Sequence, residues 1–252
     1  AYLNSVFSAS STTDNGKKWT LSMWIKRAEL GGTKTLFSVN TWPDYFWIRF
    51  DDDVISMLDR YDHIIQPSIA TTAKFKDTAA FLHCVFIYDS TLAVVSDRMQ
   101  IWVNGERQSV AGAYSIPQNR VSRVFAGGTH YIGTLVNIGS TIYELGDYMS
   151  DVYGIDGQAL TPTDFAQTDS NGQWVPKTYS GSGYGNNGFH LDFKDSANIG
   201  NDVSGNGNHF NAINITAKNL VDDAPYQSPS HSVRKIKELS PYFFHHPRDL
   251  VR

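Results

Sequence analysis

Three polar residues in the last quarter of the chain have the types and spacing of a calcium-binding loop. In the stretch DVSGNGNHF, Asp202, Ser204 and Asn206 alternate, and a glycine follows them. Such alternation presents successive side-chain oxygens, the ligands that Ca²⁺ prefers. Ile213 occupies the position where such a loop carries its bidentate glutamate. An Asx-type turn, in which the same side chains bond their own backbone, is therefore the competing interpretation.

A second group of residues could bind a sugar. In NTWPDYFW, we expect Trp42, Asp44 and Tyr45 to lie on a loop and Trp47 to begin the next strand. Sugar-binding sites on β-sandwiches combine aromatic rings with carboxylate or amide acceptors on loops. The alternative is that Trp42 covers the core or contacts a neighbouring subunit.

The carboxylates do not form a glycosidase pattern. Retaining glycosidases need two carboxylates about 5–5.5 Å apart, which on one strand means acids at alternate positions. The nearest approach is YELGDYMSD, where Glu144, Asp147 and Asp151 stand three and four residues apart. The chain also lacks a G-x-S-x-G elbow and the lysine that follows a phosphate-binding glycine loop. We therefore expect no enzymatic activity.

Four histidines occur in strand-like stretches, and we expect them to be structural partners rather than catalytic bases: His63, His83, His130 and His190.

Composition excludes several function classes. The net charge is -4 over 252 residues, and basic residues cluster only near the C-terminus, which argues against nucleic-acid binding. Cys84 is the only cysteine, so no internal disulfide or cysteine zinc site can form, and its apolar surroundings predict a buried side chain. No apolar run approaches the roughly 20 residues of a membrane helix.

The elements that must position these residues are almost all strands. In KWTLSMWIKRA, Trp19, Leu21, Met23 and Ile25 alternate with polar residues, as expected for a sheet with one buried face. FLHCVFIY predicts a central strand covered on both faces. The Asn-Gly at 104–105 predicts a tight hairpin.

One short helix is expected within ALTPTDFAQ, with Thr161 as its N-cap and Pro162 as its first residue. The pattern as a whole predicts an all-β antiparallel sandwich of the jelly-roll kind over residues 1–218. Residues 219–252 read as a linker and C-terminal extension. In it Tyr242, Phe243 and Phe244 should contact a partner chain.

Several segments resemble a known family. WTLSMWIKR, DRMQIWVNGERQ, MSDVYGIDGQALTPTDF and DVSGNGNHF are similar to parts of concanavalin A-like sandwiches of the laminin-G type. The order of IDGQAL, GQWVPK, NGFHLDF and DVSGNGN more closely resembles virion proteins of tailed, often marine, bacteriophages. The resemblance implies that NGFHLDF supplies a strand returning to the sandwich.

The resemblance to virion proteins also implies a function. We expect a non-enzymatic phage virion protein, made in the host cytoplasm, that serves attachment to host-surface glycan or decoration of the particle. Its expected partners are other virion proteins, further copies of itself and a glycan, with calcium as a possible cofactor and neither nucleic acid nor membrane insertion. The alternatives are a purely structural capsid or tail component and, less favoured, a glycan hydrolase.

Overall fold

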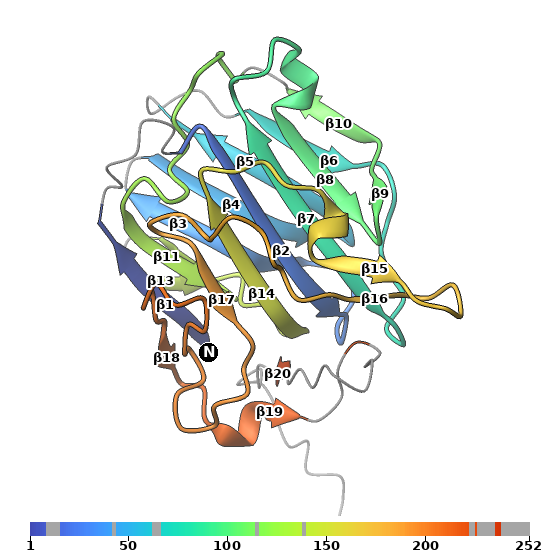
Figure 1. The fold of residues 1–252 in the computed structure, drawn as a ribbon, viewed down its shortest axis with the longest axis vertical. Coiled ribbons are helices and arrows are strands. Elements are labelled where there is room, and N and C mark those ends of the chain that lie inside the picture. Colours follow the sequence, from blue (N-terminus) through green and yellow to red (C-terminus); the bar gives the residue numbers. More distant parts are fainter. Residues whose placement is uncertain are drawn as a thin grey trace, which may run out of the picture.

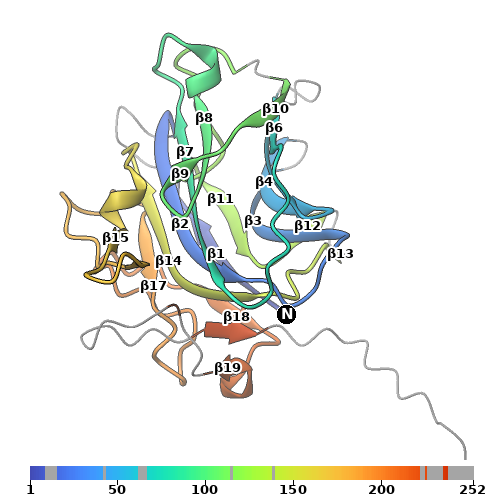
Figure 2. The same cartoon turned by 90° about the vertical axis from the view of Figure 1, so that its right-hand side faces the viewer.

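Two large antiparallel sheets pack face to face in a computed structural model of the chain (Figure 1). The structure describes residues 1–8, 16–41, 44–61, 67–113, 116–137, 140–221, 225 and 235–237. Figure 2 shows the sheets as two layers, with further chain on the outer side of each. The predicted all-β sandwich is confirmed.

Sheet A contains eight strands. In spatial order they are β10 (Val110–Ala113), β6 (Ser68–Thr71), β5 (Val54–Arg60), β4 (Asp44–Asp51), β3 (Thr33–Thr41), β11 (Gly128–Ile132), β1 (Tyr2–Phe7) and β18 (Asn211–Ile213).

Sheet B contains eight more strands. Its order is β19 (Leu220–Val221), β20 (Lys235–Lys237), β14 (Tyr148–Asp156), β2 (Lys18–Lys26), β7 (Phe81–Asp89), β8 (Met99–Val103) and β9 (Glu106–Arg107), and β17 (Phe189–Leu191) also pairs with β14.

Smaller elements lie outside these two sheets. Two hairpins combine β12 (Leu135–Asn137) with β13 (Ser140–Ile142) and β15 (Ala166–Thr168) with β16 (Trp174–Pro176), and the 3-10 turns are η1 (Val95–Asp97), η2 (Pro162–Asp164) and η3 (Ala217–Asn219). Within the described part of the chain, no helix has the length and apolar character needed to cross a membrane.

The core lies between the two sheets, where the alternating residues of β2 contribute as predicted. Trp19, Leu21, Met23 and Ile25 are fully buried in one continuous apolar cluster. Cys84 is buried in the same cluster, and burial raises the pKa of its thiol. Its expected role as a small apolar core residue is confirmed.

The opposite face of β2 is also buried, which the sequence analysis did not predict. The segment 157–188 covers it: Thr20 donates a hydrogen bond to the carbonyl of Gln158 (2.9 Å) and accepts one from the amide of Leu160 (2.8 Å). A second apolar cluster of Tyr153 and Phe165, among others, fills the space below this segment. The central strands of sheet B, β14, β2 and β7, are therefore buried on both faces.

Local turn signals predicted the connections well. Asn104 and Gly105 join β8 to β9 with positive φ angles of 50° and 82°, as an Asn-Gly hairpin requires. The expected helix is a single 3-10 turn, η2, although Thr161 and Pro162 occupy the predicted positions. The turn ends at once because the chain enters β15 two residues later.

The chain returns to the sandwich where the resemblance implied. β17, from NGFHLDF, pairs with β14 through Val152, Tyr153 and Gly154. β20 of the C-terminal extension pairs with β14 as well, in register at Tyr148, Met149 and Ser150. Part of the extension thus adds to sheet B, while its docking on a partner chain stays a prediction.

A buried guanidinium links the two sheets at one end of the sandwich. Arg27, which follows β2, donates to Asp147 before β14 (2.9 Å) and to Asp53 in the turn between β4 and β5 (3.1 Å). It also donates to the carbonyl of Phe75 (2.8 Å) and lies 4.0 Å from the centre of the Phe50 ring. One side chain thereby holds four segments from both layers.

Replacing Arg27 should strongly destabilise the protein. Arg27→Ala leaves the carboxylate of Asp147 buried without its counter-charge and leaves Asp53 with Lys76 alone, 3.8 Å away, which should cost about 3–5 kcal/mol of unfolding free energy. Urea denaturation measures this loss. The control is Arg107→Ala, which removes the exposed ion pair to Asp97 and should cost at most about 1 kcal/mol. Equal losses for the two variants would contradict the linking role of Arg27.

Candidate functional site

The predicted calcium loop has the geometry of a turn closed by its own backbone. The carboxylate of Asp202 accepts hydrogen bonds from the amides of His190 (2.9 Å), Ser204 (2.9 Å) and Asn208 (2.8 Å) and from the hydroxyl of Ser204 (2.9 Å). Both oxygens of the carboxylate are engaged in this way. The contacts are those of the Asx-type alternative.

The asparagines of this loop attach it to a neighbouring segment. The side-chain amide of Asn206 donates to the carbonyls of Gly185 (2.6 Å) and Gly188 (2.9 Å), and that of Asn208 also donates to Gly188 (2.8 Å). Among the described residues, no group of three or more histidine, cysteine or acidic side chains could hold a metal. Calcium binding by Asp202, Ser204 and Asn206 stays a prediction, and the geometry favours a structural turn.

The predicted sugar-binding patch is not a loop platform. Trp42 lies outside the described residues, and Asp44 and Tyr45 belong to β4 instead of the loop. Asp44 is buried and forms an ion pair with Arg123, so it is not available to a ligand. Trp47 is only 7% exposed, because Leu135 packs on it and Arg49 stacks 3.7 Å from its ring centre. Of this patch, Tyr45 alone remains half-exposed among the described residues.

Tyr45 belongs to a larger group on the outer face of sheet A. Strand register places Asn40 opposite Tyr45, Thr129 opposite Asn40, and Asn4 opposite Tyr131. All five side chains are half-buried. We call these five residues, together with Tyr2, the tyrosine row; the Tyr2 and Tyr131 rings lie 5.9 Å apart.

The hairpin of β12 and β13 lies against β3 on the outer side of sheet A (Figure 2). The hydroxyl of Ser38 donates a hydrogen bond to the carbonyl of Thr134 (2.8 Å), and the side-chain amide of Asn40 donates one to the carbonyl of Val136. Arg60 lies at one end of the row, with its guanidinium 5.2 Å from the ring centre of Tyr45. The row therefore combines ring surfaces, amides and one cation.

Sequence reasoning missed most of the tyrosine row, although a signal was present. In YLNSVF, the polar or exposed positions Tyr2, Asn4 and Val6 alternate with buried Leu3 and Phe7. This alternation marks an open outer face. Only the pairing order β4-β3-β11-β1 shows that residues far apart in sequence share that face.

Every described histidine of the predicted set is held by structural partners. Trp174 donates to Nδ1 of His83 (3.1 Å), so Nε2 carries the proton and donates to the Ser22 hydroxyl (2.8 Å). Burial lowers the pKa of His83 to about 3. This tautomer cannot accept the serine proton, as a catalytic histidine must. His63 lies outside the described residues.

His130 and His190 are engaged as well. Nε2 of His130 accepts the amide of Phe125 (3.0 Å), so Nδ1 donates to the carbonyl of Gly128 (3.1 Å). His190 lies 2.7 Å from a carboxylate oxygen of Asp151 and stacks on Tyr153, with ring centres 3.9 Å apart. The expected structural role of these histidines is confirmed for the described ones.

The acidic cluster YELGDYMSD is dispersed by the fold. Glu144 pairs with the N-terminal ammonium (3.2 Å), Asp147 with Arg27, and Asp151 with His190. Each carboxylate therefore serves a different structural contact.

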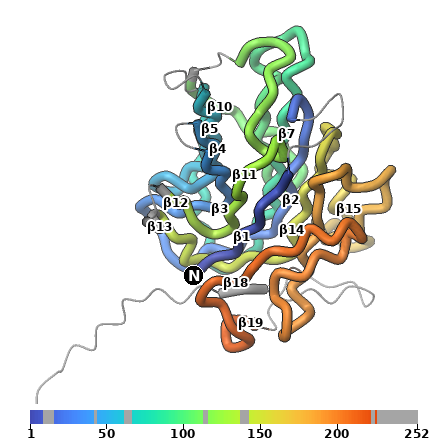
Figure 3. The backbone as a smooth tube through the Cα atoms, turned by 90° about the vertical axis from the view of Figure 1, so that its left-hand side faces the viewer, coloured from blue at the N-terminus to red at the C-terminus, as the bar shows by residue number. Residues whose placement is uncertain are grey.

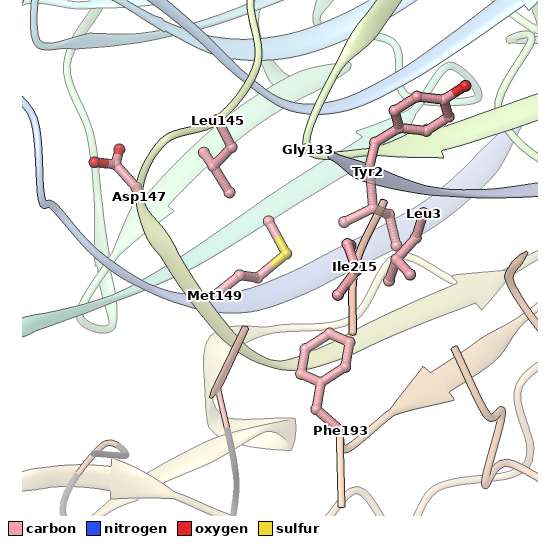
Figure 4. A pocket seen from close by; sticks show the side chains of 9 residues that line it. Tyr2, Leu3, Gly133, Leu145, Asp147, Met149, Phe193 and Ile215 are labelled. Atoms are coloured by element: carbon pink, nitrogen blue, oxygen red, sulfur yellow. The ribbon is translucent and has the colours of Figure 1, made fainter. Parts of the chain in front are cut away.

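An apolar pocket lies between the sheets near the N-terminus (Figure 4). It comprises about 290 Å³ of space that includes open solvent, and it is lined by Leu3, Leu145, Met149, Phe193 and Ile215, among others. The carboxylate of Asp147, at its border, is directed away from these side chains. The pocket offers no polar group to orient a ligand, so we assign it to core packing.

The aromatic residues predicted to contact a partner, Tyr242, Phe243 and Phe244, lie outside the described residues. Their contact with another chain stays a prediction.

Comparison with known proteins identifies the fold independently. A laminin G-type family model described as the concanavalin A-like lectin/glucanases superfamily matches residues 4–140. No curated protein gives a significant sequence match.

Three solved structures are similar. A candidate carbohydrate-binding protein from Bacteroides ovatus ATCC 8483 has a TM-score of 0.50 and 16% identity, over 84% of this chain and 56% of that one. The CBM40 of a Ruminococcus gnavus IT-sialidase, bound to α2,3-sialyllactose, has a TM-score of 0.43 and 12% identity, over 64% of this chain and 89% of that one. Domains LG4-5 of the mouse laminin α1 chain have a TM-score of 0.43 and 13% identity, over 71% of this chain and 42% of that one.

These similarities concern the fold, and the chain spans little more than half of the Bacteroides protein.

The turn at Asp202 can be tested by substitution. Asp202→Asn replaces one acceptor oxygen by a donor, so that two of the four hydrogen bonds are lost, and unfolding free energy should fall by about 1–3 kcal/mol. The control Asp77→Asn changes an exposed carboxylate that accepts one amide and should have little effect. Added CaCl₂ should not raise the Tm of the wild type. A calcium-dependent rise that Asp202→Asn abolishes would restore the calcium interpretation.

A buried carboxylate beside Asp44 predicts a pH dependence of stability. Asp59 is fully buried, and neither of its oxygens has a hydrogen-bond partner. Burial raises its pKa from 3.8 to about 7, although Arg120 and Arg123 oppose the shift and Asp44 adds to it. At a pH between these two pKa values, Asp59 is protonated in the folded protein and ionised in the unfolded chain. The free energy of unfolding should therefore fall as the pH rises from about 4 to about 7.

Asp59→Asn should remove this dependence, since the amide cannot ionise. Thermal unfolding at pH 5 and pH 8 should show a larger loss of Tm on going to pH 8 for the wild type than for the variant. The same change in Tm between pH 5 and pH 8 in the wild type and in Asp59→Asn would contradict the raised pKa of Asp59.

Proposed function

The chain belongs to the concanavalin A-like lectin/glucanases superfamily, and we propose that it binds glycan through the tyrosine row without catalysis. The observation that supports this is the set of half-exposed tyrosines interleaved with amide and hydroxyl side chains on the open face of sheet A. The central strands of the other large sheet, β14, β2 and β7, are buried on both faces.

The side chains of the row suit a sugar. A tyrosine ring is apolar on its faces and polar at its hydroxyl, so it can pack against the C–H side of a pyranose and bond its hydroxyl groups. Asn4 and Asn40 supply amide donors and acceptors beside the rings, and Thr129 supplies a hydroxyl. A few placed polar groups among aromatic surfaces are the usual composition of small-molecule sites.

The histidine and carboxylate side chains that could support hydrolysis form structural contacts instead. His83 has the wrong tautomer to accept a serine proton, and the carboxylates at 144, 147 and 151 pair with three different groups. These contacts favour a binding protein over a hydrolase.

We further propose that the protein is a surface component of a tailed-phage virion, on a fibre, spike or capsid, where the sandwich attaches to host-surface glycan or decorates the particle. Support comes from the order of IDGQAL, GQWVPK, NGFHLDF and DVSGNGN in the sequence. Other virion proteins and further copies of this chain would be its neighbours, and assembly would begin in the host cytoplasm.

Substitutions in the tyrosine row should weaken glycan binding. Tyr45→Ala and Tyr131→Ala each remove a ring, and each should weaken binding on a glycan array at least about tenfold, the effect of about 1.4 kcal/mol. The matched control is Tyr148→Ala, a half-buried tyrosine on the other sheet, which should bind as the wild type does.

Two outcomes would replace the proposal. A protein that binds neither glycans nor host cells, yet incorporates tightly into particles, would be a purely structural virion component. Release of reducing ends from host polysaccharide would instead make it a hydrolase.

A further inference from the structure

A polar pocket lies at the end of sheet A, beyond its edge strand β18. It is formed between β18, the loop 196–199 and the segment that leads into η3, and it encloses about 670 Å³ of space that includes open solvent. Ser196, Asn198, Asn211 and Thr216 line it, and all four side chains are exposed. We call it the edge pocket.

The walls of the edge pocket are built, not incidental. Asp195 accepts hydrogen bonds from the amides of Ala197 (2.9 Å) and Asn198 (3.2 Å), which fixes the loop in an Asx-type turn. On the other side, Asn219 accepts from the amide of Thr216 (2.9 Å) and from its hydroxyl (3.2 Å). Hydrogen bonds therefore fix the backbone of both walls, and the hydroxyl of Thr216 is held as well.

The chemistry of the lining selects a class of ligand. The pocket is lined by amides, hydroxyls and short apolar side chains, with buried Ile199 and Phe210 at its base, and no lining residue is ionisable. Such groups offer hydrogen bonds without a charge to neutralise. They suit a neutral, hydroxyl-rich molecule better than an ion or an apolar one.

The edge pocket continues the tyrosine row. Asn211 lines the pocket, and its amide donates to the side-chain oxygen of Asn4 (3.4 Å), a member of the row. Asn4 stands directly opposite Tyr131 in the strand register. Figure 3 shows β18, β1 and β11 following one another at this edge of the sheet.

The distance between the two regions sets the size of a shared ligand. Four strand spacings separate β4, which carries Tyr45, from β18. At about 4.8 Å per spacing this amounts to roughly 19 Å, a length that a single sugar ring cannot span. A ligand that reaches both must be an extended chain of several rings.

We propose that the edge pocket is a second subsite, which binds the continuation of the glycan held on the tyrosine row, so that the protein recognises an extended neutral oligosaccharide. This inference rests on the proposed function and adds the length and charge class of its ligand. Short fragments occupy the tyrosine row alone, and longer ones gain the hydrogen bonds of Ser196, Asn198 and Asn211.

Titration calorimetry with ladders of neutral oligosaccharides tests the proposal. The probes are gluco- and manno-oligosaccharides of two to six units, together with the neutral glycan bound most tightly on the array in the same range of lengths. Affinity of the wild type should rise about tenfold or more from the shortest to the longest member, as one or two added hydrogen bonds provide.

The double variant Ser196→Ala/Asn198→Ala should lose this rise and bind every length as the wild type binds the shortest. Both residues are exposed and their backbone turn is retained, and circular dichroism checks the fold. The matched control Asn171→Ala, an exposed loop asparagine on the hairpin of β15 and β16, should keep the rise.

The outcomes separate the two proposals. Binding that is independent of length, or a length dependence that the double variant keeps, overturns the edge pocket while leaving the tyrosine row in place. Preference for acidic over neutral chains of equal length also overturns it. The proposed function itself is overturned if Tyr45→Ala binds oligosaccharides of every length as tightly as the wild type does, or if the wild type binds none of them.

Discussion

The sandwich depends on one buried cation. Arg27 has no exposed surface, and its guanidinium joins the end of β2, the turn between β4 and β5, the start of β14 and the segment at Phe75. A charge in this position is costly to desolvate unless each of its donors is satisfied. Two carboxylates and two carbonyls meet that requirement, and so they fix how the layers approach.

The partners of Arg27 differ in their own environment. The hydrogen bond from the amide of Gly31 holds the pKa of Asp53 below its usual range. Burial raises the pKa of Asp147, although the amides of Ala28 and Glu29 and the charge of Arg27 oppose the shift. The acidic turn at 51–53, which the sequence marks as polar, thus becomes part of the link between the sheets.

The outer faces of the two sheets differ in how far other parts of the chain cover them, and the proposed binding surface lies on the less covered one. Segment 157–188 lies over sheet B, where the Trp174 indole reaches His83 and Thr20 bonds the covering chain. Among the residues that the structure describes, sheet A carries only the short hairpin of β12 and β13 on its outer face. Because aromatic rings left half-exposed on a protein surface commonly mark a binding site, the tyrosine row is the natural place for a ligand.

The sequence alone determined the fold class, the buried face of β2 and the hairpin at Asn104 and Gly105, because period-2 alternation and turn chemistry are local properties. It left the loop at Asp202 open between a calcium site and an Asx-type turn, and the tertiary contacts of that carboxylate favour the turn. It also predicted that the histidines serve structure. It could not place Asp44, Trp47 or Arg27, since their burial depends on Arg123, Leu135 and Asp147, which stand far away in the chain. Only the tertiary structure brought Tyr45, Tyr131 and Asn4 onto one face, because strand order is set by packing between distant segments and not by any local pattern.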